Sequence, residues 1–385
     1  MSIEELNQLV KQKLSHYKGI IKRPAKGKIP YDYLVPGGPY NEQWDWDAFF
    51  MGVALSADIS SEAIYLKNWS LNYIMNAQPN GKIAGCVTPD GADPRLNQMK
   101  PFLAQGTYLA GVFLKDFNWI KPHWNELKKI VFYRERNLWN KKYDLGVWFD
   151  SMESGADNNV AALNFPNKSV IATDLNTFIY QEYKALSLVA INLGYKNDFQ
   201  VYKERAGKIK HNINKYLWNS EESIYYNLDA YSESHIKRIS YSCFLPLWAK
   251  IAPKQSGETM INEYLLSKKH MFSNFGIRTL SKADVEYNNV NMIKPHSNWQ
   301  GPIWPIANYI YMHVLINYGF DKEANDLAKT ISLLVLKDIE ENGGMHENYN
   351  AENGEPLAAP NFVSWNMLIH NMIDEAQTKK NPFKI

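Results

Sequence analysis

KEANDLAKTISLLVLKDIEE, residues 322–341, is the stretch that shows most plainly how this chain folds. Apolar side chains recur in it every three or four residues, at Ala324, Leu327, Ala328, Ile331, Leu334, Val335 and Ile339. This spacing places them on one face of an α-helix, and a globular protein buries such a face. Residues 175–193 show a second clear helical pattern, and Thr173 and Asp174 before them are good N-caps.

Helical patterns of this kind dominate the whole chain, whereas segments that alternate with a period of two are few. We predict twelve helices, near residues 4–15, 44–55, 61–76, 102–115, 124–140, 175–193, 198–218, 242–252, 256–267, 304–318, 322–341 and 362–376. No linker divides the chain, and no repeat supports the rival interpretation, a helical solenoid. The sequence therefore predicts an all-α fold, an (α/α)6 barrel of six hairpins in two layers, as a single catalytic domain over residues 1–385.

The joins between the predicted helices alternate in length. Counting the predicted helices from one to twelve, the join from an even-numbered helix to the next is short, as at 57–60 and 194–197. The join from an odd-numbered helix to the next is long: 16–43, 77–101, 141–174, 219–241, 268–303 and 342–361. Helices that run alternately up and down a barrel bring all odd-to-even joins to one end. We therefore expect the six long joins to share one face, which is where function concentrates.

Composition excludes several classes of partner. The 385 residues include 42 basic and 40 acidic side chains, a net charge of +2, so neither nucleic acid nor an anionic membrane is expected as partner. No apolar run is long enough to span a bilayer, and the N-terminus does not resemble a secretory signal. We expect a cytoplasmic protein in which Cys86 and Cys243 are buried free thiols.

The long joins are rich in aromatic side chains, amides and carboxylates, in a chain that is 14% aromatic. Flat rings beside polar groups suit a sugar site, and cleaving a glycoside requires two carboxyl groups. The candidates are Asp45, Asp47, Asp90, Asp150, Glu153, Asp157, Glu347, Glu352 and Glu355. Asp157 and Glu347 are favoured, because each follows glycine-containing sequence and has amides beside it. Alternatively, Asp45 and Asp47 cap a helix.

Other kinds of site have weaker support. His296 and His346 lie in long joins, but they lack the spacing of metal ligands, so we expect no metal and no cofactor. No phosphate-binding loop, dinucleotide fingerprint or serine-nucleophile motif is present. Trp299 and Trp304 fit a core as well as a site. The expected partner is a small carbohydrate.

Taken together, these joins resemble glycoside hydrolase family 63, a relative of the trehalases on the same barrel. The matching segments are Trp44–Asp47, Lys100–Gln105, Glu153–Asn158, Asp174–Asn176, Trp299–Pro305 and His346–Tyr349, in the family's order. The resemblance implies that Asp157 is the general acid, that Glu347 is the general base and that the reaction inverts the anomeric centre. It also implies a substrate pocket formed by Trp44, Trp46, Asp47, Gln105, Trp299, Gln300, Gly301, Trp304 and Tyr349.

Two departures from the family pattern bear on the substrate. The acid motif continues with Asn159-Val160 where the family usually has Ser-Pro, and Gln300 replaces a usual arginine. A carboxylate-bearing leaving group such as glycerate would need another cation, and Lys100, Arg95 and Arg278 are candidates. The expected reaction removes a terminal α-linked glucose or mannose from a small glycoside. Four alternatives remain: a trehalase-like enzyme, a sugar epimerase using His296 and His346, an inactive sugar-binding protein and a helical scaffold.

Overall fold

The computed structural model describes residues 1–291 and 297–385. This part of the chain contains twelve α-helices: α1 (Ile3–Ser15), α2 (Asp45–Asp58), α3 (Ala63–Asn76), α4 (Leu103–Leu114), α5 (Trp124–Asn137), α6 (Thr173–Asn192), α7 (Lys196–Tyr216), α8 (Leu245–Trp248), α9 (Lys254–Met260), α10 (Pro305–Tyr318), α11 (Asp321–Asn342) and α12 (Ile369–Thr378). The prediction of a mostly helical protein is confirmed, and nine of the twelve predicted ranges agree with these bounds to within a few residues.

Three predicted helices are shorter than expected. The segment 242–252 is a 3-10 helix (Tyr241–Phe244) followed by a single turn, α8, after which Lys250 adopts a left-handed conformation with φ of 54°. The segment 256–267 is α9 followed by a π-helix, Ile261–Leu265. The last predicted helix begins with a 3-10 helix, Ser364–Leu368. Further 3-10 helices are His16–Gly19, Ser60–Glu62, Asn118–His123 and Ser151–Ser154.

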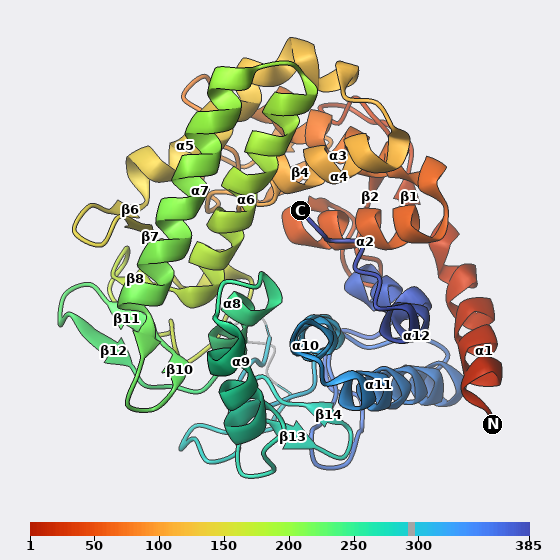
Figure 1. Cartoon of the computed structure of the whole chain (residues 1–385). Helices are drawn as coiled ribbons and strands as arrows, with labels where there is room; N and C mark the ends of the chain where they lie inside the picture. Colours follow the sequence, from red (N-terminus) through yellow and green to blue (C-terminus); the bar gives the residue numbers. More distant parts are fainter. Residues whose placement is uncertain (292–296) are drawn as a thin grey trace.

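The even-numbered helices form a closed cycle of contacts. α2 contacts α4, α4 contacts α6, and the cycle continues through α8, α10 and α12 back to α2. The odd-numbered helices pack against this cycle, as Figure 1 shows for α7 beside α6 and α11 beside α10. The burial of each helix agrees with its position. α2, in the cycle, is buried on nearly every side, whereas α7, outside it, buries only Tyr202, Ala206, Ile209 and Ile213.

The strands of the described chain are short and lie in the long joins. They are β1 (Lys22–Arg23), β2 (Tyr33–Leu34), β3 (Gln43–Trp44), β4 (Cys86–Thr88), β5 (Gly91–Ala92), β6 (Trp139–Asn140), β7 (Leu145–Gly146), β8 (Val170–Ile171), β9 (Trp218–Asn219), β10 (Ile224–Tyr225), β11 (Asn227–Asp229), β12 (Ser234–Ile236), β13 (Phe272–Ser273) and β14 (Gly276–Ile277). They pair as β1-β2, β3-β4-β5, β6-β7, β8-β11-β12, β9-β10 and β13-β14, all antiparallel.

The six long joins are linked to one another in order, which confirms that they share one face. β3 pairs with β4 between the first and second joins, and β8 pairs with β11 between the third and fourth. Isolated bridges link the fourth join to the fifth and the fifth to the sixth. The Asn97 amide donates to Asp150 at 2.9 Å between the second and third joins. Val363 N donates to Pro36 O at 3.0 Å, which closes the circle.

Several smaller expectations concern the chain as a whole. Cys86 and Cys243 are buried free thiols, as predicted. Among residues 1–291 and 297–385, no helix has both the length and the apolar character to cross a membrane. Within the same residues, no group of three or more His, Cys, Asp or Glu side chains is placed to hold a metal ion.

Candidate active site

A cavity of about 420 Å³ opens among the long joins. It is lined by Pro36, Tyr40, Trp44, Trp46, Asp47, Gly85, Cys86, Leu96, Asn97, Gln98, Lys100, Met152, Glu153, Gly155, Asp157, Ser297, Glu347, Phe362 and Trp365. These residues come from five of the six joins and from the first turn of α2. The size and the mixture of rings and polar groups suit a small organic ligand.

Glu347 lies within electrostatic reach of two other carboxyl groups that line this pocket, those of Asp47 and Asp157. Burial, together with the negative charges of Asp47 and Asp157, raises the pKa of Glu347 to about 8. Burial also raises the pKa of Asp47 to about 7, although Ser364 Oγ donates a hydrogen bond to it at 2.6 Å. The pKa of Tyr40 is raised by burial and by the charges of Glu347, Asp47 and Asp157. These carboxyl groups therefore hold a proton more readily than exposed carboxyl groups do.

Asp157 is held by a tight turn and by the fifth join. Ser297 Oγ donates to Asp157 Oδ2 at 2.9 Å. Gly155, two residues earlier, has a φ of +78°, and a Cβ on it would lie 2.6 Å from the Trp46 ring and 2.8 Å from Lys100. Asn158 accepts a hydrogen bond from Trp299 N at 2.6 Å. Glycine is thus required where the acid motif passes close to the pocket wall.

Glu347 is positioned by hydrogen bonds on either side of it. Asp338, near the end of α11, accepts hydrogen bonds from His346 N at 2.8 Å and from the Tyr349 hydroxyl at 2.8 Å. The same carboxylate contacts His346 Nδ1 at 2.9 Å. Glu347 N donates to Ala358 O at 2.9 Å. The backbone is therefore fixed while the Glu347 side chain lines the cavity.

Aromatic rings form the walls of the pocket. Trp46 and Trp365 meet edge to face with centroids 5.3 Å apart, and Tyr40 contacts Trp44 and Phe362 at 6.4 and 6.0 Å. Within the described chain, the buried indole N–H groups of Trp44 and Trp365 have no hydrogen-bond partner. A buried donor without a partner is costly, so these two groups are suited to bind the hydroxyls of a ligand.

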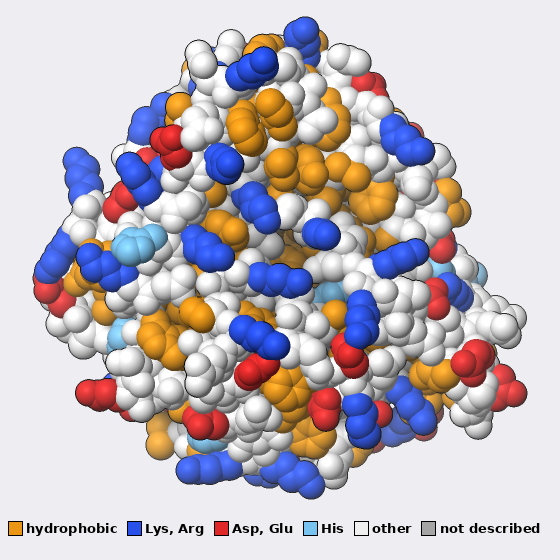
Figure 2. Space-filling model, in the orientation of Figure 1, with side chains coloured by type: hydrophobic (Ala, Val, Ile, Leu, Met, Phe, Trp, Pro, Cys, Tyr) orange, Lys and Arg blue, Asp and Glu red, His pale blue; other side chains and the backbone are white. Residues whose placement is uncertain are grey.

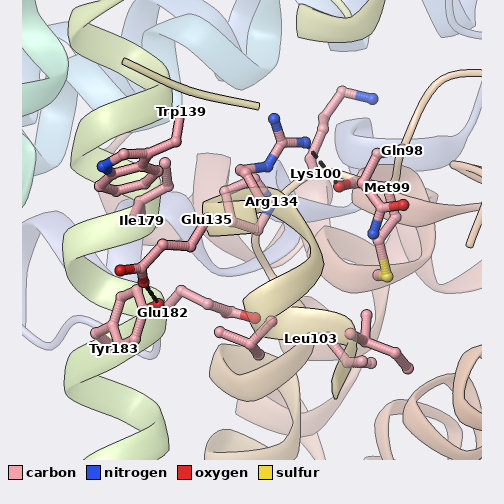
Figure 3. Close-up of a pocket in the computed structure, with 13 residues that line it drawn as sticks. Gln98, Met99, Lys100, Leu103, Arg134, Glu135, Trp139, Ile179, Glu182 and Tyr183 are labelled. Carbon is pink, nitrogen blue, oxygen red and sulfur yellow. Dashed lines mark hydrogen bonds between the residues drawn. The ribbon is translucent and has the colours of Figure 1, made fainter. Parts of the chain in front are cut away.

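Two buried ion pairs support the pocket from behind. Lys100 Nζ contacts Asp45 Oδ1 at 3.1 Å, and Arg134 Nη2 donates to Glu153 Oε1 at 2.7 Å. Figure 3 shows the Arg134 guanidinium near Lys100, where a hydrogen bond to Met99 O at 3.1 Å also holds it. Glu153 and Lys100 line the cavity, but each is already paired. Lys100 thus attaches the second join to α2, while Arg134 of α5 binds the third join through Glu153 and the second join through Met99 O.

A family model for the mannosylglycerate hydrolase MGH1-like glycoside hydrolase domain matches residues 40–365. The chain belongs to this glycoside hydrolase family. The predicted resemblance to family 63 is thus confirmed, and the pocket lies within the matched region.

Individual relatives are distant. The chain is 22% identical over 290 residues to mannosyl-oligosaccharide glucosidase of Saccharomyces cerevisiae, covering 68% of this chain and 34% of that protein. It is 23% identical over 397 residues to cytosolic neutral trehalase of Kluyveromyces lactis, covering 85% of this chain and 52% of that protein. The chain thus spans about a third to a half of these two relatives' lengths.

Solved structures show the shared fold. The GH63 mannosylglycerate hydrolase of Thermus thermophilus in complex with glucose has a TM-score of 0.73 at 16% identity, covering 94% of this chain and 99% of that one. The same enzyme in complex with Tris and D-glycerate has a TM-score of 0.71 at 16% identity, covering 96% of this chain and 99% of that one.

In the structure of the present chain, five of the predicted site residues lie together. Trp44, Trp46, Asp47, Asp157 and Glu347 all line the cavity. Their roles in binding and catalysis stay predictions.

Six predicted pocket residues do not line the cavity: Gln105, Trp299, Gln300, Gly301, Trp304 and Tyr349. The Gln105 side-chain amide donates to Pro101 O at 2.7 Å and Phe178 O at 3.1 Å, which ties α4 to α6. Trp299 stacks on Trp304 with centroids 4.1 Å apart, and it supports Trp46 at 6.1 Å. These side chains act behind the pocket wall rather than on it.

The remaining three of these six residues, Gln300, Gly301 and Tyr349, stabilise the conformation of the long joins. Gln300 Nε2 donates to Asn158 O at 3.1 Å. A Cβ on Gly301 would lie 2.4 Å from Asn288 O, so glycine permits a close backbone approach there. Tyr349 bonds to Asp338 and bridges to Ile303. In the described structure, each residue therefore holds backbone or a neighbouring side chain in place.

The remaining candidate carboxyl groups and cations have other partners or lie away from the cavity. Asp150 caps the 3-10 helix before Asp157, and Glu352 pairs with Arg278 at 2.9 Å, so Arg278 serves an ion pair. Arg95 is bound to Asp93 at 2.7 Å. Asp90, Glu352 and Glu355 do not line the cavity. His296 lies outside the described residues.

Several pocket residues were missed by the sequence analysis, notably Tyr40, Asn97, Ser297, Phe362 and Trp365. Tyr40 follows a turn at Gly37 and Gly38, both with positive φ, inside a long join. Its position in that join was a usable signal. Trp365 was missed because residues 362–376 were predicted as one helix, whereas Trp365 lies in the 3-10 helix before α12.

Proposed function

We propose that this chain is an inverting α-glycoside hydrolase that removes a terminal α-linked glucose or mannose from a small glycoside. We further propose that residues 1–385 form one catalytic domain, an (α/α)6 barrel. Family membership and the closed cycle of even-numbered helices support the barrel. One observation carries the function: Asp157 and Glu347, from different joins, line one aromatic pocket and interact electrostatically.

In this mechanism Asp157 donates a proton to the glycosidic oxygen, and Glu347 removes one from a water molecule that attacks the anomeric carbon from the opposite side. The two carboxyl groups must then be about 6.5–9.5 Å apart to leave room for the water. Only the state with Asp157 protonated and Glu347 ionised is productive. Activity should therefore follow a bell-shaped pH profile, falling at low pH as Glu347 gains a proton and at high pH as Asp157 loses one.

The pocket walls fit the sugar ring. Trp46 and Trp365 present apolar surface for its CH face, and the unpaired indole N–H groups of Trp44 and Trp365 can donate to its hydroxyls. Asp47, a buried residue that lines the pocket, can accept hydrogen bonds from them. The substrate is therefore a small carbohydrate. The chain's own residues account for each step without a cofactor, and a cytoplasmic location stays a prediction.

The proposal is tested by proton NMR of the first sugar released from α-glucosides and α-mannosides. We expect the β-anomer, which marks inversion, and the α-anomer would exclude it. Asp157→Asn and Glu347→Gln should each lower kcat by about 10²–10⁴-fold while the circular dichroism spectrum stays unchanged. Near wild-type kcat in a folded variant would remove that residue from its role.

A trehalase-like activity is the second candidate, favoured by the likeness to cytosolic neutral trehalase over 85% of this chain. Trehalose in the same assay separates the two. An epimerase has less support, because His346 is bonded to Asp338 and does not line the cavity.

A further inference from the structure

The two ends of the pocket differ in exposure. Asp47 and Glu347 are only 6% and 7% exposed, whereas Leu96 and Met152 are 40% and 37% exposed and line the same cavity. An enzyme that removes a terminal sugar holds that sugar at the closed end. The leaving group, or aglycone, then lies at the open end, against Leu96 and Met152.

Leu96 and Met152 form what we term the apolar rim. They come from the second and third joins, and a hydrogen bond from Asn97 to Asp150 at 2.9 Å ties these joins together beside them. A single exposed apolar side chain on a protein surface needs no explanation. Here two exposed apolar side chains line one concave site, and a hydrogen bond joins the segments that carry them. Such an arrangement indicates a surface that contacts a ligand.

The cations near the rim are already engaged. Arg95 is 88% exposed at its side chain, and its Nε and Nη2 both donate to Asp93. Among the described residues that line the cavity, Lys100 is the one lysine or arginine, and it is buried against Asp45. Among the described residues, a carboxylate placed at the rim would lose water and could gain only a cation that is already paired with another carboxylate, which is unfavourable.

We infer, on the basis of the proposed hydrolase function, that the aglycone subsite selects an uncharged aglycone with an apolar face, and that Leu96 and Met152 determine this preference. The apolar rim contacts the CH or ring surface of the leaving group. Asn97 and Gln98, which line the cavity beside Leu96, are neutral amides able to bind its hydroxyls.

The test compares three aglycones on the same α-linked sugar: benzyl alcohol, glycerol and glycerate. All three leave from an ordinary alcohol oxygen, so differences report mainly on the subsite. We expect kcat/KM to be at least about tenfold higher for the benzyl glycoside than for the glycerate glycoside. Leu96→Ser and Met152→Ser should each lower the benzyl value about tenfold and change the glycerol value much less. Met75→Ser, at a 55% exposed position of α3 outside the pocket, is the matched control.

The outcomes separate this inference from the function on which it rests. Hydrolysis with equal or better use of the glycerate compound overturns the inference and leaves the hydrolase intact. The same holds if neither rim variant alters the benzyl-to-glycerol ratio. No hydrolysis of any of the three, on either glucose or mannose, overturns the proposed function and the inference with it.

Discussion

The first two turns of α2 contact two different aromatic regions. At its start, Trp46 and Asp47 line the pocket. One turn later, Phe49 and Phe50 contact Phe383, at centroid distances of 5.6 and 5.2 Å. Phe383 also contacts Trp248 of α8 at 6.1 Å and Tyr309 of α10 at 5.8 Å. One region is therefore an open cavity, and the other is closed by a residue near the C-terminus (Figure 1).

The two regions also differ in charge. Carboxyl groups gather in the pocket, and burial raises the pKa values of Glu347 and Asp47. Near the C-terminus, the pKa of Lys184 is lowered by burial and by the charges of Lys210, Lys384 and Lys250. In Figure 2, Lys and Arg side chains gather around the middle of the face on which the C-terminus lies in Figure 1.

This contrast teaches that aromatic content alone does not identify a sugar site. Around Phe383 the rings pack against one another, although the indole N–H of Trp248 there has no hydrogen-bond partner in the described structure. Around Asp47 the rings line an open cavity together with carboxyl groups whose pKa values are raised by burial. Stability is given up at functional sites, so substitutions in the two regions should have opposite effects on it.

The largest effect on stability is expected at the closed region. Phe383→Ala removes a ring that is 3% exposed, and it should cost about 3–5 kcal/mol of unfolding free energy, because the hole cannot collapse against three helices. Chemical denaturation measures this. Tyr231→Ala, at a 70% exposed position, should cost little. A loss below about 1 kcal/mol for Phe383→Ala would show that the closed region is loosely packed.

Arg134→Met tests the buried ion pair that supports the pocket from behind. It leaves Glu153 buried without its 2.7 Å partner, which should cost about 3 kcal/mol at pH 8. The double variant Arg134→Met, Glu153→Gln should regain most of this loss, because no uncompensated charge remains. If the double variant is no more stable than the single one, packing rather than charge explains the role of Arg134.

The pocket should respond in the opposite direction. The pKa of Glu347 is raised from 4.5 to about 8, so the folded state binds this proton more tightly than the unfolded state does. The resulting stability is fully present below about pH 4.5 and is lost as pH rises through about 8. Glu347→Gln, neutral throughout, should therefore be about 1–3 kcal/mol more stable than wild type at pH 8, and this gain should vanish near pH 4.5.

Calorimetry at the two pH values checks this prediction. Glu126→Gln, at an exposed position of α5, is the matched control and should show no such dependence. Equal stability of Glu347→Gln and wild type at pH 8 would show that the carboxylate is not strained in the pocket.

The fold was largely predictable because helical periodicity is a local property. The seven apolar positions of 322–341 defined α11 without any tertiary information, and six of them are buried. The short α8 was not predictable in this way. Pro246 and the left-handed Lys250 confine it to one turn, while its apolar residues reflect burial rather than helix length.

The site was predictable only in part, because a motif does not show the direction of a side chain. Asp157 and Gln105 both lie in family motifs, but Asp157 lines the cavity and Gln105 bonds to carbonyls behind it. Trp365 had no motif, and only the chain's path from α11 to α12 brings it to Trp46. Residues that line a pocket and residues that support it look alike in sequence.

The smallest effect is expected at Lys184, where the contrast between the two regions can be sharpened. Because burial and three neighbouring lysines lower its pKa, the folded state disfavours the charged form at neutral pH. Lys184→Met keeps the apolar stem and removes the charge, so it should raise the unfolding free energy by less than about 1 kcal/mol at low salt. The gain should shrink at high ionic strength, which screens the lysines from one another. Lys329→Met, at an exposed position of α11, should show neither change. A loss of stability in Lys184→Met would mean that its ammonium makes a favourable contact, and that charge strain is confined to the pocket.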